Sequence, residues 1–263
     1  MTNTRRLRKV LPALAVGLLV PSAALAAGPV IPLPDDVAKD LELLGEGVVG
    51  KPVPAPPLDD VIDFYMGSPD GGTFTYHVIK GEKKHIQTET IKPAKDKAGQ
   101  QTWHQQIGDQ YMQYMTVHSD GSLGKFGEDD LETSYGCHFH PGIFLPGGLK
   151  PGESKKVKSK ALAYKLDKPD DTSYTGDIDA TLTYVGAYEV TTPAGTWPAA
   201  LIRSEFDIKI GPAKVTDVQY SFLVKGVGKI AEIEALRVSA LFIYHSDDKT
   251  AKVLAERPER GEK

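Results

Sequence analysis

The chain has 263 residues, a formal net charge of −4 and a single cysteine. This length is sufficient for one large hydrophobic core or two small ones. One cysteine cannot form an intramolecular disulfide, so stability has to come from buried apolar surface. The acidic balance argues against nucleic acid and anionic lipid as partners, because both bind to positive surfaces.

Residues 1–26 have the three parts of a secretory signal peptide. A basic head comes first, an apolar run extends from Val10 to Val20, and small residues lead up to Ala26. The run is too short for a membrane span, which needs about 20 apolar residues. We therefore expect a periplasmic or secreted protein that does not span a membrane. Cleavage would remove four basic residues and no acid, which takes the charge from −4 to −8.

Residues 27–66 form a proline-rich arm that contains a predicted short helix. In its middle, Val37, Leu41 and Leu44 recur at helical spacing, which is typical of an amphipathic helix with one apolar face. A second short helix is possible over residues 58–66. The arm is thus expected to hold one or two short helices between extended prolyl segments.

Residues 67–263 are predicted to form an antiparallel β domain. Apolar and polar residues alternate with a period of two, and β-branched and aromatic residues are frequent. The Asp120-Gly121 pair is a strong hairpin signal. The predicted strands cover residues 73–79, 85–91, 101–107, 110–118, 156–166, 179–190, 199–210, 215–224 and 234–245.

The fold class that follows is mainly β. No long helical pattern separates the strands, so we expect an antiparallel curved sheet, either a half-barrel or a sandwich, with one or two short N-terminal helices. Within it, Phe206, Ile208 and Ile210 are expected on one buried face, as are Val218, Tyr220, Phe222 and Val224 on the next strand.

Two predicted strands carry large apolar residues on both faces, so something must cover both sides. The N-terminal helices are one candidate. The other is an apolar small molecule or lipid lying in the curved sheet, to which flexible methionines would adapt well. The predicted ligand-binding residues are Tyr111, Met112, Tyr114, Met115, Phe242 and Tyr244.

The segment Tyr135–Gly142 holds the only cysteine, Cys137, followed by His138 and His140. These three residues are the candidate ligands of a metal ion, zinc or copper. On an extended strand, however, the two imidazoles point one way and the thiol points the other, so a common site requires a bend. No third ligand of fixed spacing is visible, whereas structural zinc uses four. Buried sheet is the competing interpretation.

Catalytic signatures are missing from the sequence. The stretch GEGVVG at residues 45–50 matches a dinucleotide pattern but neither follows a strand nor opens a helix. Acidic residues cluster between Glu128 and Glu132, and acidic clusters in loops are usually solvated. A hydrolase built on this cluster is the third hypothesis, and we expect a protein that is not an enzyme.

The segments Tyr188–Ile208 and Val218–Ile233 resemble a pattern in uncharacterised exported bacterial proteins. There, a strand runs into Pro-Ala-Gly-Thr-aromatic, here Pro193–Trp197, and a later strand ends in Gly-Val-Gly, here Gly226–Gly228. Some of these proteins are likened to the half-barrels of periplasmic lipoprotein carriers, which hold acyl chains against a concave face. The resemblance covers the C-terminal half of the chain and implies, by analogy, a lipid or other apolar ligand.

Two functional hypotheses lead. The first is an exported β protein that binds an apolar ligand, such as a lipid or an acylated partner, as a carrier or chaperone-like factor. The alternative is a periplasmic metal-binding protein that uses the Cys-His-x-His segment.

Overall fold

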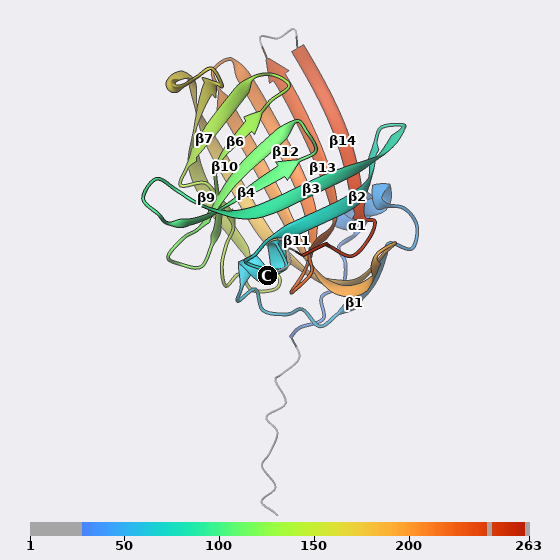
Figure 1. Ribbon diagram of the computed structural model, residues 1–263. Coiled ribbons are helices and arrows are strands. Elements are labelled where there is room, and N and C mark those ends of the chain that lie inside the picture. The colour runs from blue at the N-terminus through green and yellow to red at the C-terminus, as the bar shows by residue number, and fades with distance from the viewer. Residues whose placement is uncertain (1–27, 241–243, 261–263) are drawn as a thin grey trace, which may run out of the picture.

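The computed structural model describes residues 28–240 and 244–260 (Figure 1). The predicted signal peptide and Phe242 lie outside these ranges. The elements in chain order are α1 (Asp35–Leu41), the 3-10 helix η1 (Glu42–Leu44), β1 (Val49–Val53), α2 (Val61–Tyr65), β2 (Gly72–Lys80), β3 (Lys83–Lys95), β4 (Gln101–Ile107), β5 (Tyr111–Val117), β6 (Leu123–Asp130), β7 (Tyr135–His140), β8 (Ile143–Leu145), β9 (Ser154–Lys165), β10 (Lys168–Thr192), β11 (Gly195–Ile210), β12 (Ala213–Val224), β13 (Gly228–Ala240) and β14 (Tyr244–Leu254).

The strands form one antiparallel sheet that closes into a 12-stranded barrel. Starting at β10, the order runs through β11 to β14, then β2 to β7, then β9, and β9 pairs again with β10. The predicted half-barrel or sandwich is therefore wrong, although the mainly β content and the two short helices agree with the prediction. Long-range pairings explain the difference, because β14 pairs with β2 and β7 pairs with β9, so the sheet closes on itself. The strand β10 also begins at Lys168, ahead of the apolar alternation that starts at Ile178, and its polar first residues extend the pairing with β9.

The barrel wall separates two kinds of side chain along β9 and β10. Ile178 and Ala180 point inward, whereas the intervening Asp177 and Asp179 point outward. On the outer face, Asp179 pairs with Lys158 at 2.8 Å, and Asp177 pairs with the next outward lysine of β9. Lys158 and Lys160 of β9 are thus engaged in cross-strand ion pairs.

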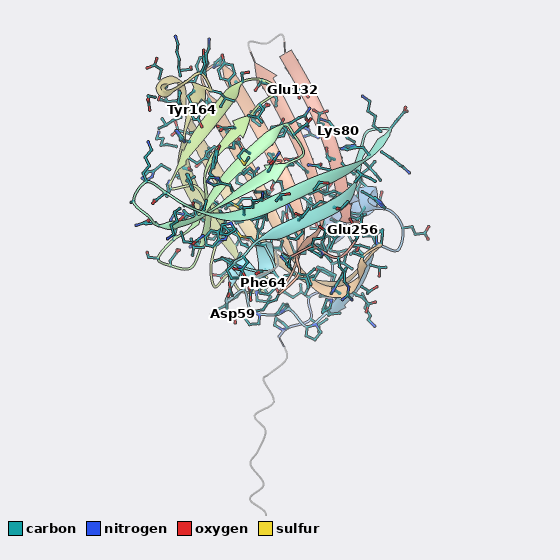
Figure 2. All side chains as sticks on the ribbon, viewed as in Figure 1. Asp59, Phe64, Lys80, Glu132, Tyr164 and Glu256 are labelled. Atoms are coloured by element: carbon teal, nitrogen blue, oxygen red, sulfur yellow. The ribbon has the colours of Figure 1, made fainter. Side chains whose placement is uncertain are left out.

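One end of the barrel is filled by α2. Asp60 caps this helix by accepting a hydrogen bond from the Asp63 backbone N–H at 3.2 Å. Phe64, Tyr65 and Met66 are buried in the main hydrophobic cluster. Figure 2 places Phe64 at this end and Glu132 toward the opposite end. The helix α2 and the barrel therefore share a core at this end.

The helices α1 and η1 pack against the outside of the barrel. Val37, Leu41 and Leu44 are buried in the main cluster, and η1 contacts β13 and β14. The Tyr220 hydroxyl donates to the Asp40 carboxylate of α1 at 2.7 Å. The apolar outer face of these strands is thus covered by the chain itself. No helix in the ranges 28–240 and 244–260 is long and apolar enough to cross a membrane.

Candidate functional site

The barrel encloses a cavity of about 1240 Å³ above the end that α2 fills. The rim of the cavity includes Tyr111 and Tyr135, whose side chains are 41% and 39% exposed. The cavity therefore opens to solvent at the end opposite α2. Its volume exceeds the roughly 300–1,000 Å³ of typical small-molecule sites.

One wall of the cavity is apolar. It is built from inward positions of β9 to β12, where Ala180 of β10 lies between Val157 of β9 and Phe206 of β11 in the register. The small residues leave room beside the large ones, which suits an aliphatic or aromatic group. The wall consists of Val157, Ala161, Ala163, Ile178, Ala180, Phe206, Ile208, Ile210 and Val215.

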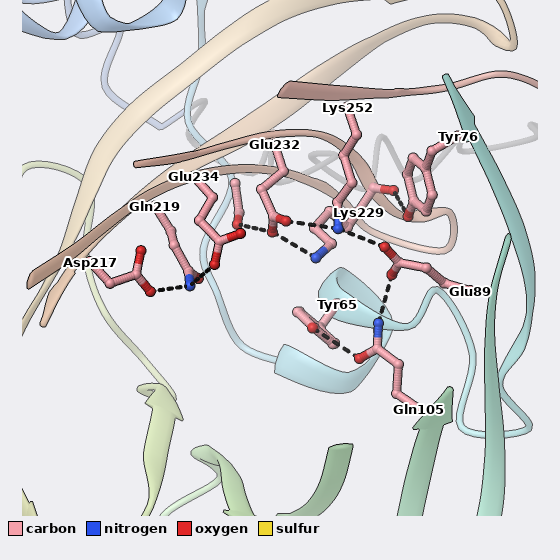
Figure 3. Close-up of polar contacts among 11 residues, drawn as sticks. Tyr65, Tyr76, Glu89, Gln105, Asp217, Gln219, Lys229, Glu232, Glu234 and Lys252 are labelled. Carbon is pink, nitrogen blue, oxygen red and sulfur yellow. Dashed lines mark hydrogen bonds and ion pairs between the residues drawn. The ribbon is translucent and has the colours of Figure 1, made fainter. Parts of the chain in front are cut away.

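The floor of the cavity is a buried network of charges (Figure 3). Lys252 lies 2.6 Å from a Glu89 oxygen and 2.8 Å from a Glu232 oxygen. Lys229 contacts the other Glu232 oxygen at 2.6 Å. The second Glu89 oxygen accepts from the Gln105 amide at 2.7 Å. Each of these charges has a partner of opposite sign, as buried ions require.

The network keeps its groups ionised. Burial raises the pKa of Glu232, but Lys229 and Lys252 outweigh it and lower that pKa to about 2. Burial likewise opposes the charge of Lys252, yet Glu232 and Glu89 raise its pKa above the ordinary lysine value. The floor is therefore a fixed, polar surface at neutral pH.

Beside the floor, two more carboxylates share one amide. The Gln219 amide nitrogen lies 2.6 Å from Asp217 Oδ2 and 3.3 Å from Glu234 Oε1. Burial, and next the charge of Glu234, raise the pKa of Asp217 to about 7. Burial, and next Glu232, raise the pKa of Glu234. Unlike the floor, this pair has no lysine in contact among the described residues.

The predicted ligand-binding residues fall on both sides of the barrel wall. Tyr111 lines the cavity rim, and Met115 is buried in the core near the closed end. Met112 and Tyr114 alternate with them and face outward, where the Tyr114 hydroxyl donates to Asp129 at 2.7 Å. Tyr244 begins β14 opposite Ala240. The structure thus brings Tyr111 to the cavity and separates it from Met112 and Tyr114.

The candidate metal ligands lie on the extended strand β7. Cys137 lines the cavity, whereas His138 and His140 are exposed on the other face, where the His138 ring packs on Tyr164 at 4.5 Å. The strand pairs without interruption with β9, so the bend that a common site requires is not present. Among the described residues, no group of three or more His, Cys, Asp or Glu side chains could hold a metal ion. Metal binding by this segment stays a prediction.

Sequence reasoning missed the charged residues of the cavity. Asp217 and Gln219 alternate with Val218 and Tyr220, and the apolar set was expected to face the core of an open sheet. Instead the polar set faces inward, and Tyr220 packs under α1 on the outside. Glu128, predicted in a loop, lies on β6 and lines the cavity. A usable signal existed, since polar residues at alternate positions of several strands also fit a polar barrel interior.

No protein-family model and no curated protein matches the sequence. Solved structures of similar shape include a protein from Bacteroides fragilis described as a predicted exported protein with a YmcC-like fold. It has 12% identity, 73% coverage of this chain, 98% coverage of that chain and a TM-score of 0.45. A predicted lipoprotein from Parabacteroides distasonis has 11% identity, 74% and 97% coverage, and a TM-score of 0.37. The hypothetical lipoprotein YmcC from Escherichia coli has 8% identity, 71% and 87% coverage, and a TM-score of 0.36.

Proposed function

We propose that the protein is an exported binding protein that holds an amphipathic small molecule inside its barrel. The observation that carries the proposal is the composition of the cavity, which is open at one end, apolar on one wall and charged at its floor. An apolar chain or ring would lie against β9 to β12, and a polar group would face the floor. The predicted signal peptide supports a periplasmic or secreted location.

Cys137 and Glu128, the two cavity residues that the sequence suggested for chemistry, favour binding over catalysis. Burial, and next the charge of Glu128, raise the pKa of Cys137 to about 12, so its thiolate is scarce at neutral pH. The Glu128 carboxylate is held by Lys125 at 2.8 Å. A nucleophile or general base needs the opposite properties, a lowered pKa or an available carboxylate.

The test is a fluorescence titration with N-phenyl-1-naphthylamine, a neutral probe whose emission rises in apolar surroundings. Ala163 lines the apolar wall, and the neighbouring Leu162 faces outward and is 37% exposed. Ala163→Phe would fill the space in which the probe binds, whereas Leu162→Phe adds the same ring type outside. We expect the wild-type protein to bind the probe and Ala163→Phe to weaken binding at least about tenfold.

The matched variant Leu162→Phe should bind like the wild type. Circular dichroism of both variants would confirm that the barrel still forms. The proposal fails if the wild-type protein gives no emission rise, or if the inward and outward variants bind the probe equally.

A further inference from the structure

The cavity contains more carboxylates than its own lysines neutralise. Each lysine that lines it already has an acidic partner. Lys80 pairs with Asp248 at 3.7 Å and Lys125 with Glu128 at 2.8 Å, while Lys229 and Lys252 belong to the floor network. The lining carboxylates that contact no lysine among the residues that the structure describes include Asp217 and Glu234, which share the Gln219 amide.

Asp217 is the less satisfied of the two carboxylates. Its side chain is buried, with 8% of the residue exposed, and within the described residues its Oδ1 atom has no hydrogen-bond partner. A buried carboxylate oxygen without a donor is costly, and such groups in native proteins call for an explanation. A cationic donor that enters the cavity would supply the missing hydrogen bond.

The surroundings of Asp217 are apolar on both sides. In register, Asp217 lies opposite Phe206 of β11 on one side and Leu236 of β13 on the other. Gln219 fixes its second oxygen and links it to Glu234. A negative group is thus held inside the apolar wall rather than at the solvent rim, where water would screen it.

We propose that the ligand of the cavity is a cationic amphiphile, whose ammonium or guanidinium group binds between Asp217 and Glu234 and whose apolar part lies along Phe206, Ile208 and Val215. This inference rests on the proposed function and adds the charge of the ligand to it. A neutral lipid could at most donate one hydroxyl or amide hydrogen to Asp217 Oδ1, and it would bring no positive charge to balance the two carboxylates. An anionic amphiphile would meet two further carboxylates and lysines that are already paired.

Binding of such a cation is expected to depend on pH. The pKa of Asp217, about 7, means that its carboxylate is largely protonated at pH 6 and ionised at pH 8. An alkylamine stays charged over this range, since its pKa resembles the 10.4 or so of lysine. Affinity should therefore rise from pH 6 to pH 8. The charged groups that act on the pair are Lys125 of β6, Lys229 and Glu232 of β13, and Lys252 of β14.

The experiment compares three ligands of equal chain length, decylamine, decan-1-ol and decanoate, as competitors of the bound fluorescent probe. The two ionic ligands are kept below their micelle concentrations and decan-1-ol below its solubility limit. We expect decylamine to compete at pH 8 at least about tenfold better than decan-1-ol, and decanoate to compete worst. In Asp217→Asn combined with Glu234→Gln, which keeps amide oxygens to accept from Gln219, the advantage of decylamine should vanish while decan-1-ol binds as before.

Three outcomes would overturn the inference. These are equal competition by decylamine and decan-1-ol, stronger competition by decanoate, and a decylamine advantage that survives in the double variant. An advantage that does not change between pH 6 and pH 8 would contradict the expected role of the Asp217 charge. Each of them leaves the proposed function standing, because the probe is still displaced. If no ligand displaces the probe and the probe itself does not bind, the proposed function fails.

Discussion

Lys252 is the residue on which most of the floor network depends. Its ammonium group is buried and contacts both Glu89 and Glu232. Removing one member of such a network destabilises the fold more than replacing the whole network by apolar residues, because the remaining ions stay buried without compensation. Single-residue effects inside the barrel should therefore be much larger than those on its outer face.

We expect Lys252→Met to lower the free energy of unfolding at pH 7 by about 3–5 kcal/mol, measured by urea denaturation. The outward lysine of a cross-strand pair offers the control, and Lys158→Met should cause little change, since exposed pairs contribute little. If the two substitutions lowered the free energy of unfolding equally, the buried network would not contribute more to stability than an exposed ion pair does.

The pH dependence of this effect follows from Glu232. Its folded-state pKa is lowered to about 2 from an ordinary value near 4.5, so its ionised form stabilises the fold above about pH 4.5. That contribution is lost as the pH falls toward 2. The cost of Lys252→Met should accordingly shrink when the unfolding titration is repeated at pH 3, because Glu232, which has lost one of the two lysines that lower its pKa, can then take up a proton.

At the scale of elements, the two short helices perform different tasks. The helix α1 and the adjoining η1 cover an outer face of the barrel, while α2 fills one end from within. Tyr65 of α2 donates to the Gln105 side chain at 3.1 Å, and the Lys229 ammonium lies 5.4 Å from the Tyr65 ring centre. The position of α2 therefore also supports the charged floor above it.

Truncating a buried side chain of α2 should destabilise the fold strongly. Phe64 is 1% exposed, and Phe64→Ala is expected to reduce the free energy of unfolding by about 3–5 kcal/mol through lost burial and the cavity left behind. The matched control is Ile86, which is exposed on β3. The free energy of unfolding of Ile86→Ala should stay within about 0.5 kcal/mol of the wild-type value in the same urea titration. If Phe64→Ala and Ile86→Ala lowered the free energy of unfolding by the same amount, Phe64 of α2 would not be part of the core.

The whole molecule is organised by the closure of its sheet, which gives every strand an inside and an outside. Cys137 and His138 are neighbours in sequence, yet one lies in the cavity and the other on the outer surface. The single thiol is thus a natural reporter for the interior of the barrel.

Cys137 should react slowly with dithionitrobenzoate at pH 8 in the folded protein and rapidly in urea, because its pKa is raised to about 12 and it lies inside the barrel. A control protein with Cys137→Ser and His138→Cys carries the thiol on the outer face and should react quickly when folded. Similar folded-state rates for the two proteins, followed by absorbance, would refute this assignment of inside and outside.

Local sequence alone determined the antiparallel β content and several of the boundaries. The Asp120-Gly121 signal correctly predicted the hairpin between β5 and β6, and the spacing of Val37, Leu41 and Leu44 predicted the helical turns that bury these residues. Both are local properties, since turn conformation and periodicity depend on residues a few positions apart.

Tertiary structure alone decided which face of each strand points inward and where the polar groups meet. Alternation shows that Asp217 and Val218 face opposite ways, but only the closure of the sheet makes the polar side of β12 the interior. The Lys252 partners Glu89 and Glu232 come from β3 and β13, far apart in sequence. Contacts between distant strands leave no periodic trace along the chain, because each strand meets the same local requirements in an open sheet and in a closed barrel.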